Sequence, residues 1–183
     1  MSRGARHVAT PSQTIGPYWH LIEDKSWSDL TRFGAREAHP DRQVITLNGV
    51  LTDGDGLPFP EACVEIWQSD PGASDVFPAF GRCATDRDGV YRFITLKPGP
   101  ERGRGNVQQA PHIAICVLAR GLMRGLVTRA YFQGEALNET DPVLGSIEDP
   151  KRRGSLIAES DGAESWRMDI CLQGENETVF FDV

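Results

Sequence analysis

The side chains best suited to metal binding or proton transfer in this 183-residue chain are its histidines. Imidazole is a common protein ligand for metals and changes its charge near neutral pH. The chain has His7, His20, His39 and His112, and no two of them stand at a spacing typical of a metal site. We interpret His112 as a satisfied core histidine, His7 as part of a solvated tail, and His20 and His39 as surface or loop residues.

The cysteines are the second group that could bind a metal or undergo redox chemistry. Cys63, Cys83, Cys116 and Cys171 are too far apart for a CxxC pair. Three of them lie in apolar, strand-like segments. This pattern indicates free thiols in a protein of the reducing cytoplasm, with a disulfide pair as the alternative.

The charge of the chain limits its partners. The formal net charge is −7, and an acidic surface repels phosphate backbones, so we expect no nucleic-acid binding. No apolar run reaches the length of a membrane span, and the polar first residues do not form a secretory signal. A small anionic ligand would need a local cationic side chain. Arg129 is one, although its place in a strand between Thr128 and Ala130 is equally typical of a solvated arginine.

The elements that must position these side chains are short strands separated by glycine turns. Asp53–Gly56 and Asp86–Gly89 are turn sequences. Residues 1–42 are irregular, and Asp141 to Ala158 is predicted as short helical turns with Asp141 as a cap before Pro142. The predicted strands are 44–51, 63–68, 90–96, 112–118, 126–132, 166–172 and 178–181. Short strands at regular spacing favour an all-β sandwich. We predict a single domain over residues 1–183 with an irregular N-terminal segment of about 1–42.

Several short segments, taken in order, carry a more specific pattern. They are Thr10–Tyr18, Val64–Gln68, Gly81–Asp86, Lys97–Pro100, Ala110–Ile113 and Thr128–Phe132. Together they resemble the intradiol ring-cleavage dioxygenases, and the C-terminal Gln173–Asp182 resembles the α chains of the family members that act on protocatechuate. The match runs from about Thr10 to Val183. The resemblance implies a mixed β-sandwich of the intradiol dioxygenase type with little helix, and cleavage of 3,4-dihydroxybenzoate by O2 to 3-carboxy-cis,cis-muconate in aromatic catabolism.

The family's iron site is where this sequence departs from the pattern. The family holds a ferric ion with two tyrosines and two histidines, the histidines as His-x-His on a strand. Here that strand begins His112-Ile113-Ala114, and Glu101 stands where a tyrosine follows Lys97–Pro100. No tyrosine lies between Trp67 and Gly81. The resemblance therefore implies no metal site and no catalytic residue in this chain, with Fe(III) held by the β subunit of the assembled enzyme.

The resemblance also implies what the chain contributes to that enzyme. In the family the α and β chains pair closely and the active site lies near their interface. The residues of this chain that match the pocket-lining positions are Arg129, Thr14, Gly16 and Pro17. Arginine suits a carboxylate that iron does not bind, so we expect Arg129 to bind the substrate carboxylate, with Thr14 as a lesser donor.

The expected partner is the β subunit, bound through a large, partly apolar interface that includes the segment around Tyr18, Trp19 and Trp27. Two other hypotheses remain open at this point. In the first of these, the chain is a self-sufficient dioxygenase with an atypical iron site. In the second, it is a non-enzymatic β-sandwich binding module.

Overall fold

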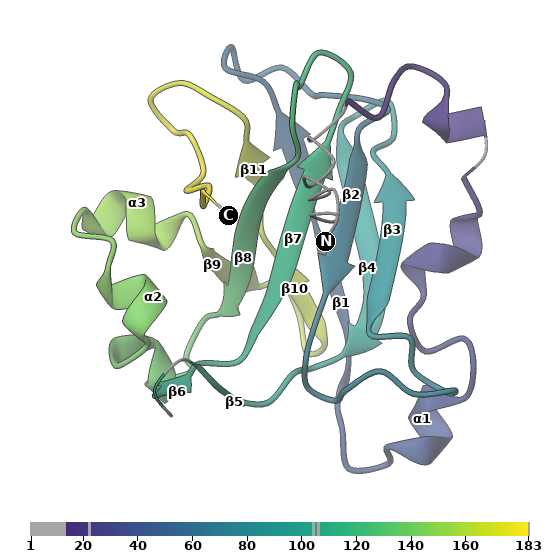
Figure 1. Cartoon of the computed structure of the whole chain (residues 1–183), viewed down its shortest axis with the longest axis vertical. Helices are drawn as coiled ribbons and strands as arrows, with labels where there is room; N and C mark the ends of the chain where they lie inside the picture. Colours follow the sequence, from purple (N-terminus) through teal and green to yellow (C-terminus); the bar gives the residue numbers. More distant parts are fainter. Residues whose placement is uncertain (1–13, 22, 104, 106, 183) are drawn as a thin grey trace, which may run out of the picture.

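The computed structural model of the chain describes residues 14–182 except 22, 104 and 106 (Figure 1). His7 and the side chain of His20 lie outside the described residues. The strands are β1 (Val44–Thr52), β2 (Cys63–Trp67), β3 (Phe80–Ala84), β4 (Val90–Leu96), β5 (Glu101–Arg102), β6 (Gln108–Gln109), β7 (His112–Leu118), β8 (Leu126–Phe132), β9 (Ile157–Ser160), β10 (Ser165–Arg167) and β11 (Ile170–Cys171). The short helices are η1 (Trp19–Leu21), η2 (Lys25–Ser28), α1 (Ala35–Ala38), η4 (Ala136–Glu139), α2 (Pro142–Gly145) and α3 (Pro150–Gly154).

Nine strands form one connected path with two layers. The order is β11-β1-β10-β9-β8-β7-β2-β3, and β4 pairs with β1. Strand β9 joins the layers because it pairs with β8 in parallel and with β10 in antiparallel. Figure 1 shows β2, β3, β7 and β8 side by side. The N-terminal helical segments lie beyond β3, whereas α2 and α3 lie on the opposite side of the molecule. Parallel and antiparallel pairs occur together, so the predicted mixed β-sandwich with little helix is confirmed.

The core lies between the two layers and follows from alternating side chains. Ile45, Leu47 and Leu51 of β1 are buried, and so are Ile113 and Ile115 of β7. Successive side chains of a strand point to opposite faces, so the residues between them point outward. In β7 these outward positions are the ones that the sequence pattern connects with chemistry.

The predicted strands match the structure best where burial alternates clearly. The strands at 90–96, 112–118 and 126–132 are confirmed, and those at 44–51 and 63–68 differ by one residue at an end. Asp141 caps α2, as expected, by accepting from the backbone of Val143 and Leu144.

Four strand assignments were wrong or missed. The prediction of helical turns up to Ala158 fails because Ile157 and Ala158 pair with β8 as strand β9, a long-range contact. The predicted strand 166–172 is broken into β10 and β11, which pair separately with β1. The predicted strand 178–181 contributes only an isolated bridge at Phe181, and β3 was not predicted at all.

The cysteines are free thiols, so the disulfide alternative is wrong. Cys63 and Cys83 are buried, and burial raises the pKa of the Cys83 thiol to about 12. A thiol with such a pKa stays protonated and is a poor nucleophile. Among the residues that the structure describes, no helix has both the length and the apolar character that a membrane span requires.

Candidate functional site

A row of outward-facing residues crosses four strands of one layer. Arg129 of β8 lies opposite Ala114 of β7, Ala114 opposite Trp67 of β2, and Trp67 opposite Phe80 of β3. Trp67 is 56% exposed and Phe80 is 40% exposed. We call this surface the open face, defined by Arg129, Ala114, Trp67 and Phe80, because the described part of the chain does not cover it.

The open face is hollowed and mostly apolar. A depression of about 370 Å³ lies along it, and its lining includes Trp67, Phe80, Ala114, Cys116 and Val127. Exposed apolar patches of this kind are typical of surfaces that bind another molecule. One end of the row carries a cation, Arg129, next to this depression.

Arg129 is held in place by a chain of buried polar side chains. Its Nη1 donates to Oε1 of Gln109 at 2.9 Å and to Oη of Tyr131 at 3.2 Å, and Tyr131 donates to Oδ1 of Asp141 at 3.2 Å. Burial raises the pKa of Tyr131 well above its usual value, so the phenol keeps the proton that it donates to Asp141. Among the described residues, Nε and Nη2 of Arg129 have no hydrogen-bond partner. The half-buried guanidinium therefore keeps donors available for a carboxylate.

Asp141 anchors this chain of contacts. Asp141 is almost fully buried, with 1% of its surface exposed. Besides Tyr131, it accepts from the backbone nitrogens of Val143 at 2.8 Å and Leu144 at 3.0 Å, and from that of Ala110 at 2.8 Å. One carboxylate thus connects the first turn of α2, the start of β7 and the support of Arg129.

Both ring nitrogens of His112 lie within hydrogen-bond distance of an oxygen atom. Its Nδ1 lies 2.8 Å from the carbonyl oxygen of Ala110, which only accepts, so Nδ1 carries the hydrogen. Its Nε2 lies 2.9 Å from Oε1 of Glu101, a distance at which a protonated imidazole donates to the carboxylate. Burial lowers the pKa of His112, and the positive charge of Arg129 lowers this pKa further. The carbonyl of Ala110 and the carboxylates of Glu101 and Asp141 oppose the shift.

These residues do not fit an iron centre in this chain. Ala114 offers no donor atom, and Nε2 of His112 is turned to Glu101. Tyr131 is engaged with Asp141 and stays protonated, unlike a tyrosinate ligand. Over the described ranges, no three side chains of histidine, cysteine, aspartate or glutamate are grouped in a way that could hold a metal ion.

The structure does not bring Thr14 and Arg129 together. The Thr14 hydroxyl donates to the carbonyl of Ala119 at 3.3 Å. Ala119 is five residues beyond Ala114, the partner of Arg129, which is about 17 Å along a strand. The Arg129 guanidinium also leans away from Ala119, toward Tyr131. Within this chain, Thr14 and Arg129 therefore occupy different parts of the surface, and one carboxylate does not reach both.

The remaining predicted wall residues lie on the surface near Thr14. Pro17 is exposed and Gly16 is half-buried with a φ of +76°, a backbone conformation that favours glycine. Tyr18 is 73% exposed, but Trp19 is buried in the chain's own core, where its Nε1 donates to the carbonyl of Glu61 at 3.2 Å. Trp19 is therefore a core residue and Tyr18 is the exposed aromatic side chain of this segment.

The sequence pointed to Arg129 as a candidate but not to the residues that support it. Tyr131 follows Arg129 by two positions, so both were bound to share one face of the strand. That signal was available. The contact of Asp141 with Tyr131 and Ala110 was not, because it depends on how the chain returns to β8 after η4.

The comparisons with known proteins agree with this geometry. A sequence model of a dioxygenase family matches residues 15–174. The chain is 40% identical over 197 aligned positions to the protocatechuate 3,4-dioxygenase alpha chain of Pseudomonas putida, covering 94% of this chain and 96% of that protein. The chain belongs to the intradiol dioxygenase family. Another family member, the protocatechuate 3,4-dioxygenase beta chain of Burkholderia cepacia, is 29% identical, with 91% of this chain and 77% of that protein covered.

Solved structures of the family share the fold. The dioxygenase domain of a dioxygenase carbohydrate-binding fusion from Streptomyces sp. SirexAA-E superposes with a TM-score of 0.61 at 25% identity, covering 90% of this chain and 98% of that one. Catechol 1,2-dioxygenase from Acinetobacter sp. ADP1 gives a TM-score of 0.57 at 21% identity, with 72% of this chain and 53% of that one covered. The resemblance stated from the sequence is therefore confirmed.

Proposed function

We propose that this chain is the iron-free α subunit of a protocatechuate 3,4-dioxygenase, in which a β subunit holds the ferric ion. The observation that carries the proposal is Arg129, a cation with unused donors at the edge of an uncovered apolar face. An aromatic ring with a carboxylate matches both features, because the ring removes apolar surface from water and the carboxylate binds the guanidinium.

The location of the iron follows from the donors that this chain lacks. A ferric ion needs its full set of ligands within reach, and the positions that match the family's ligands are here Ala114, Glu101 and a loop without tyrosine. The reacting metal must then be supplied by a partner. This reasoning disfavours a self-sufficient dioxygenase with an atypical iron site.

The partner that we propose is a β chain with the same fold. Support comes from the similarity of this chain to an alpha chain and a beta chain of one enzyme type in other bacteria. The open face gives such a partner a surface to cover, and the exposed segment with Thr14, Gly16 and Pro17 supplies a second contact. We assign these three residues to the pocket wall shared with the β chain.

The role of this chain in the reaction is to bind and orient the substrate. Arg129 fixes the carboxylate, and its fork geometry sets the direction of the ring. Tyr131 and Gln109 hold the guanidinium so that little side-chain entropy is lost on binding. Trp67 and Phe80 contribute apolar surface that excludes water once the face is covered. A non-enzymatic binding module would not need a second chain to complete its site.

The test is an Arg129 series in the complex formed with a co-expressed β chain. A hydrogen bond to a charged group is worth roughly 1.5–3 kcal/mol, so Arg129→Gln should raise KM for protocatechuate by about 10- to 100-fold. Catechol has no carboxylate, and its KM should change much less. Arg129→Lys should recover part of the loss because an ammonium does not form the fork.

The matched control is Arg92→Gln, which removes an exposed strand arginine from β4 and should leave both substrates unaffected. Iron content and assembly must be equal in all variants. If Arg129→Gln leaves the preference for protocatechuate over catechol unchanged in a fully iron-loaded complex, Arg129 does not bind the substrate.

A further inference from the structure

A second cleft lies beside β3, on the side away from Arg129. It has a volume of about 320 Å³ and is lined by Trp27, Arg32, Pro78, Phe80, Gly81 and Arg82. This is within the size range of pockets that hold small ligands. It is separated from Arg129 by three strand spacings, roughly 14 Å, so a ligand held by Arg129 does not fill it, although Phe80 borders both the open face and this cleft.

The sequence builds this cleft by letting η2 approach β3 closely. A side chain at Gly81 would put its Cβ 2.5 Å from Cδ1 of Leu30 and 2.7 Å from the carbonyl oxygen of Trp27. Only glycine allows this approach, which brings the Trp27 indole to the edge strand. The close approach of η2 therefore explains why glycine stands at position 81, within one of the segments that carry the family resemblance.

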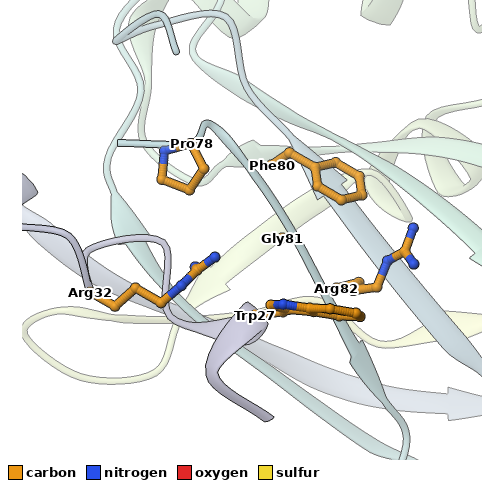
Figure 2. A pocket seen from close by; sticks show the side chains of 6 residues that line it. All are labelled: Trp27, Arg32, Pro78, Phe80, Gly81 and Arg82. Carbon is orange, nitrogen blue, oxygen red and sulfur yellow. The ribbon is translucent and has the colours of Figure 1, made fainter. Parts of the chain in front are cut away.

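The walls of the cleft are formed by two aromatic side chains and a proline. Figure 2 shows Trp27 on one side and Pro78 and Phe80 on the other, with Arg82 at one end. The Arg82 guanidinium lies 5.4 Å from the ring centres of both Trp27 and Phe80. It is also paired with Glu65 of the neighbouring strand, so its charge is already compensated and it acts as part of the wall.

The second cation is Arg32, at the other end of the cleft (Figure 2), and, after the hydrogen bonds from Ser26, its charge contributes to the lowered pKa of Asp24. Its Nη1 donates to the backbone carbonyl of Asp29 at 2.7 Å, and the guanidinium lies 4.3 Å from the Phe33 ring centre. In the part of the chain that the structure describes, no carboxylate forms an ion pair with it. The cleft therefore combines flat apolar walls with one cation at its end.

We propose that this cleft is an accessory binding site for a planar aromatic monocarboxylate. The ring lies between Trp27 and the Pro78–Phe80 wall, and the carboxylate accepts hydrogen bonds from Arg32. Offset stacking on an indole and a charge-assisted hydrogen bond each select one feature of such a ligand. An aliphatic acid lacks the first feature, and a neutral aromatic compound lacks the second.

The experiment is a binding titration of 4-fluorobenzoate followed by fluorine NMR, with the full chain alone and with its co-expressed β partner. Arg32→Gln should weaken binding by about 10- to 100-fold, the effect of one hydrogen bond to a charged group. Trp27→Leu should also weaken it. Arg87→Gln, which removes the same charge from an exposed turn, should have no effect. Cyclohexanecarboxylate and fluorobenzene should bind at least tenfold more weakly than 4-fluorobenzoate.

The proposal is separable from the role of Arg129. Arg129→Gln should remove only binding at the open face, and the binding event that depends on Arg32 should persist in the chain alone. Equal binding by Arg32→Gln and the natural chain would overturn the accessory site. So would equal binding of cyclohexanecarboxylate. Loss of the site on addition of the β chain would show instead that the cleft is a subunit contact.

Discussion

Asp141 is the residue whose replacement should cost the described site most. Its carboxylate accepts from the backbone of Val143, Leu144 and Ala110 and from the Tyr131 hydroxyl. Asp141→Ala removes an N-cap, which costs about 0.5–2 kcal/mol. It also leaves the buried Ala110 N–H without an acceptor, which costs a further 1–3 kcal/mol or so.

The expected loss for Asp141→Ala is therefore about 1.5–5 kcal/mol in the free energy of unfolding, a large share of the roughly 5–15 kcal/mol of a typical domain. Asp141→Asn should fall between the natural chain and alanine. An amide has one oxygen, so it satisfies either the cap or Ala110, and its nitrogen then faces a backbone donor.

The assay is urea unfolding at one protein concentration, with Asp149→Ala as the matched control. Asp149 caps α3 before Pro150, as Asp141 caps α2 before Pro142, but it is exposed and accepts a single bond, from Lys151 at 2.8 Å. Its loss should cost about 1 kcal/mol or less. Equal costs for Asp141→Ala and Asp149→Ala would refute the reasoning, because they would show that the buried contacts add nothing.

Two further predictions concern pH and packing. Since burial lowers the pKa of His112 below its unfolded value, the unfolded chain takes up this proton at a higher pH than the folded chain, so the natural chain should lose more stability than His112→Gln as the pH falls from about 7.5 to about 5.5; an equal loss in both chains would contradict the direction of the shift. Gly49→Ala should cost about 3 kcal/mol, the upper end of the usual range for overpacking, because its Cβ would lie 1.8 Å from the carbonyl oxygen of Met168, whereas Gly145→Ala meets no atom within 4 Å and should be neutral or stabilising in thermal melts; similar melting temperatures would contradict this.

Much of the fold was readable from alternation, and the failures have a common physical cause. The strands at 90–96, 112–118 and 126–132 alternate and are bounded by turn residues, so local sequence determines them. Strand β9 exists because Ile157 and Ala158 pair with Tyr131 and Phe132, and the local sequence carries no sign of that pairing. Strand β3 was missed because Gly81 weakens a strand pattern and is present for a close approach of η2.

The candidate site was only partly predictable for similar reasons. Arg129 stood out because a strand arginine matched the family's pattern, and the expected absence of iron ligands, read position by position, stays a prediction. The contact of Asp141 with Tyr131, which supports Arg129, could be seen only in the folded structure. The open face around Trp67 could be recognised only once the register of β2 and β7 was known. The expected cooperation of Thr14 with Arg129 did not appear within one chain, because Thr14 lies beside Ala119.

The most direct test of the division of labour between the two chains is an iron analysis of the purified chain, alone and after co-expression with a β chain. We predict that the chain alone is colourless and has no stoichiometric iron, because Ala114 and Glu101 stand at positions where the family resemblance implies ligands and His112 is engaged with Glu101. The complex should contain iron in proportion to its β chain and should consume oxygen with protocatechuate. A visible charge-transfer band with stoichiometric iron in the chain alone would contradict this assignment.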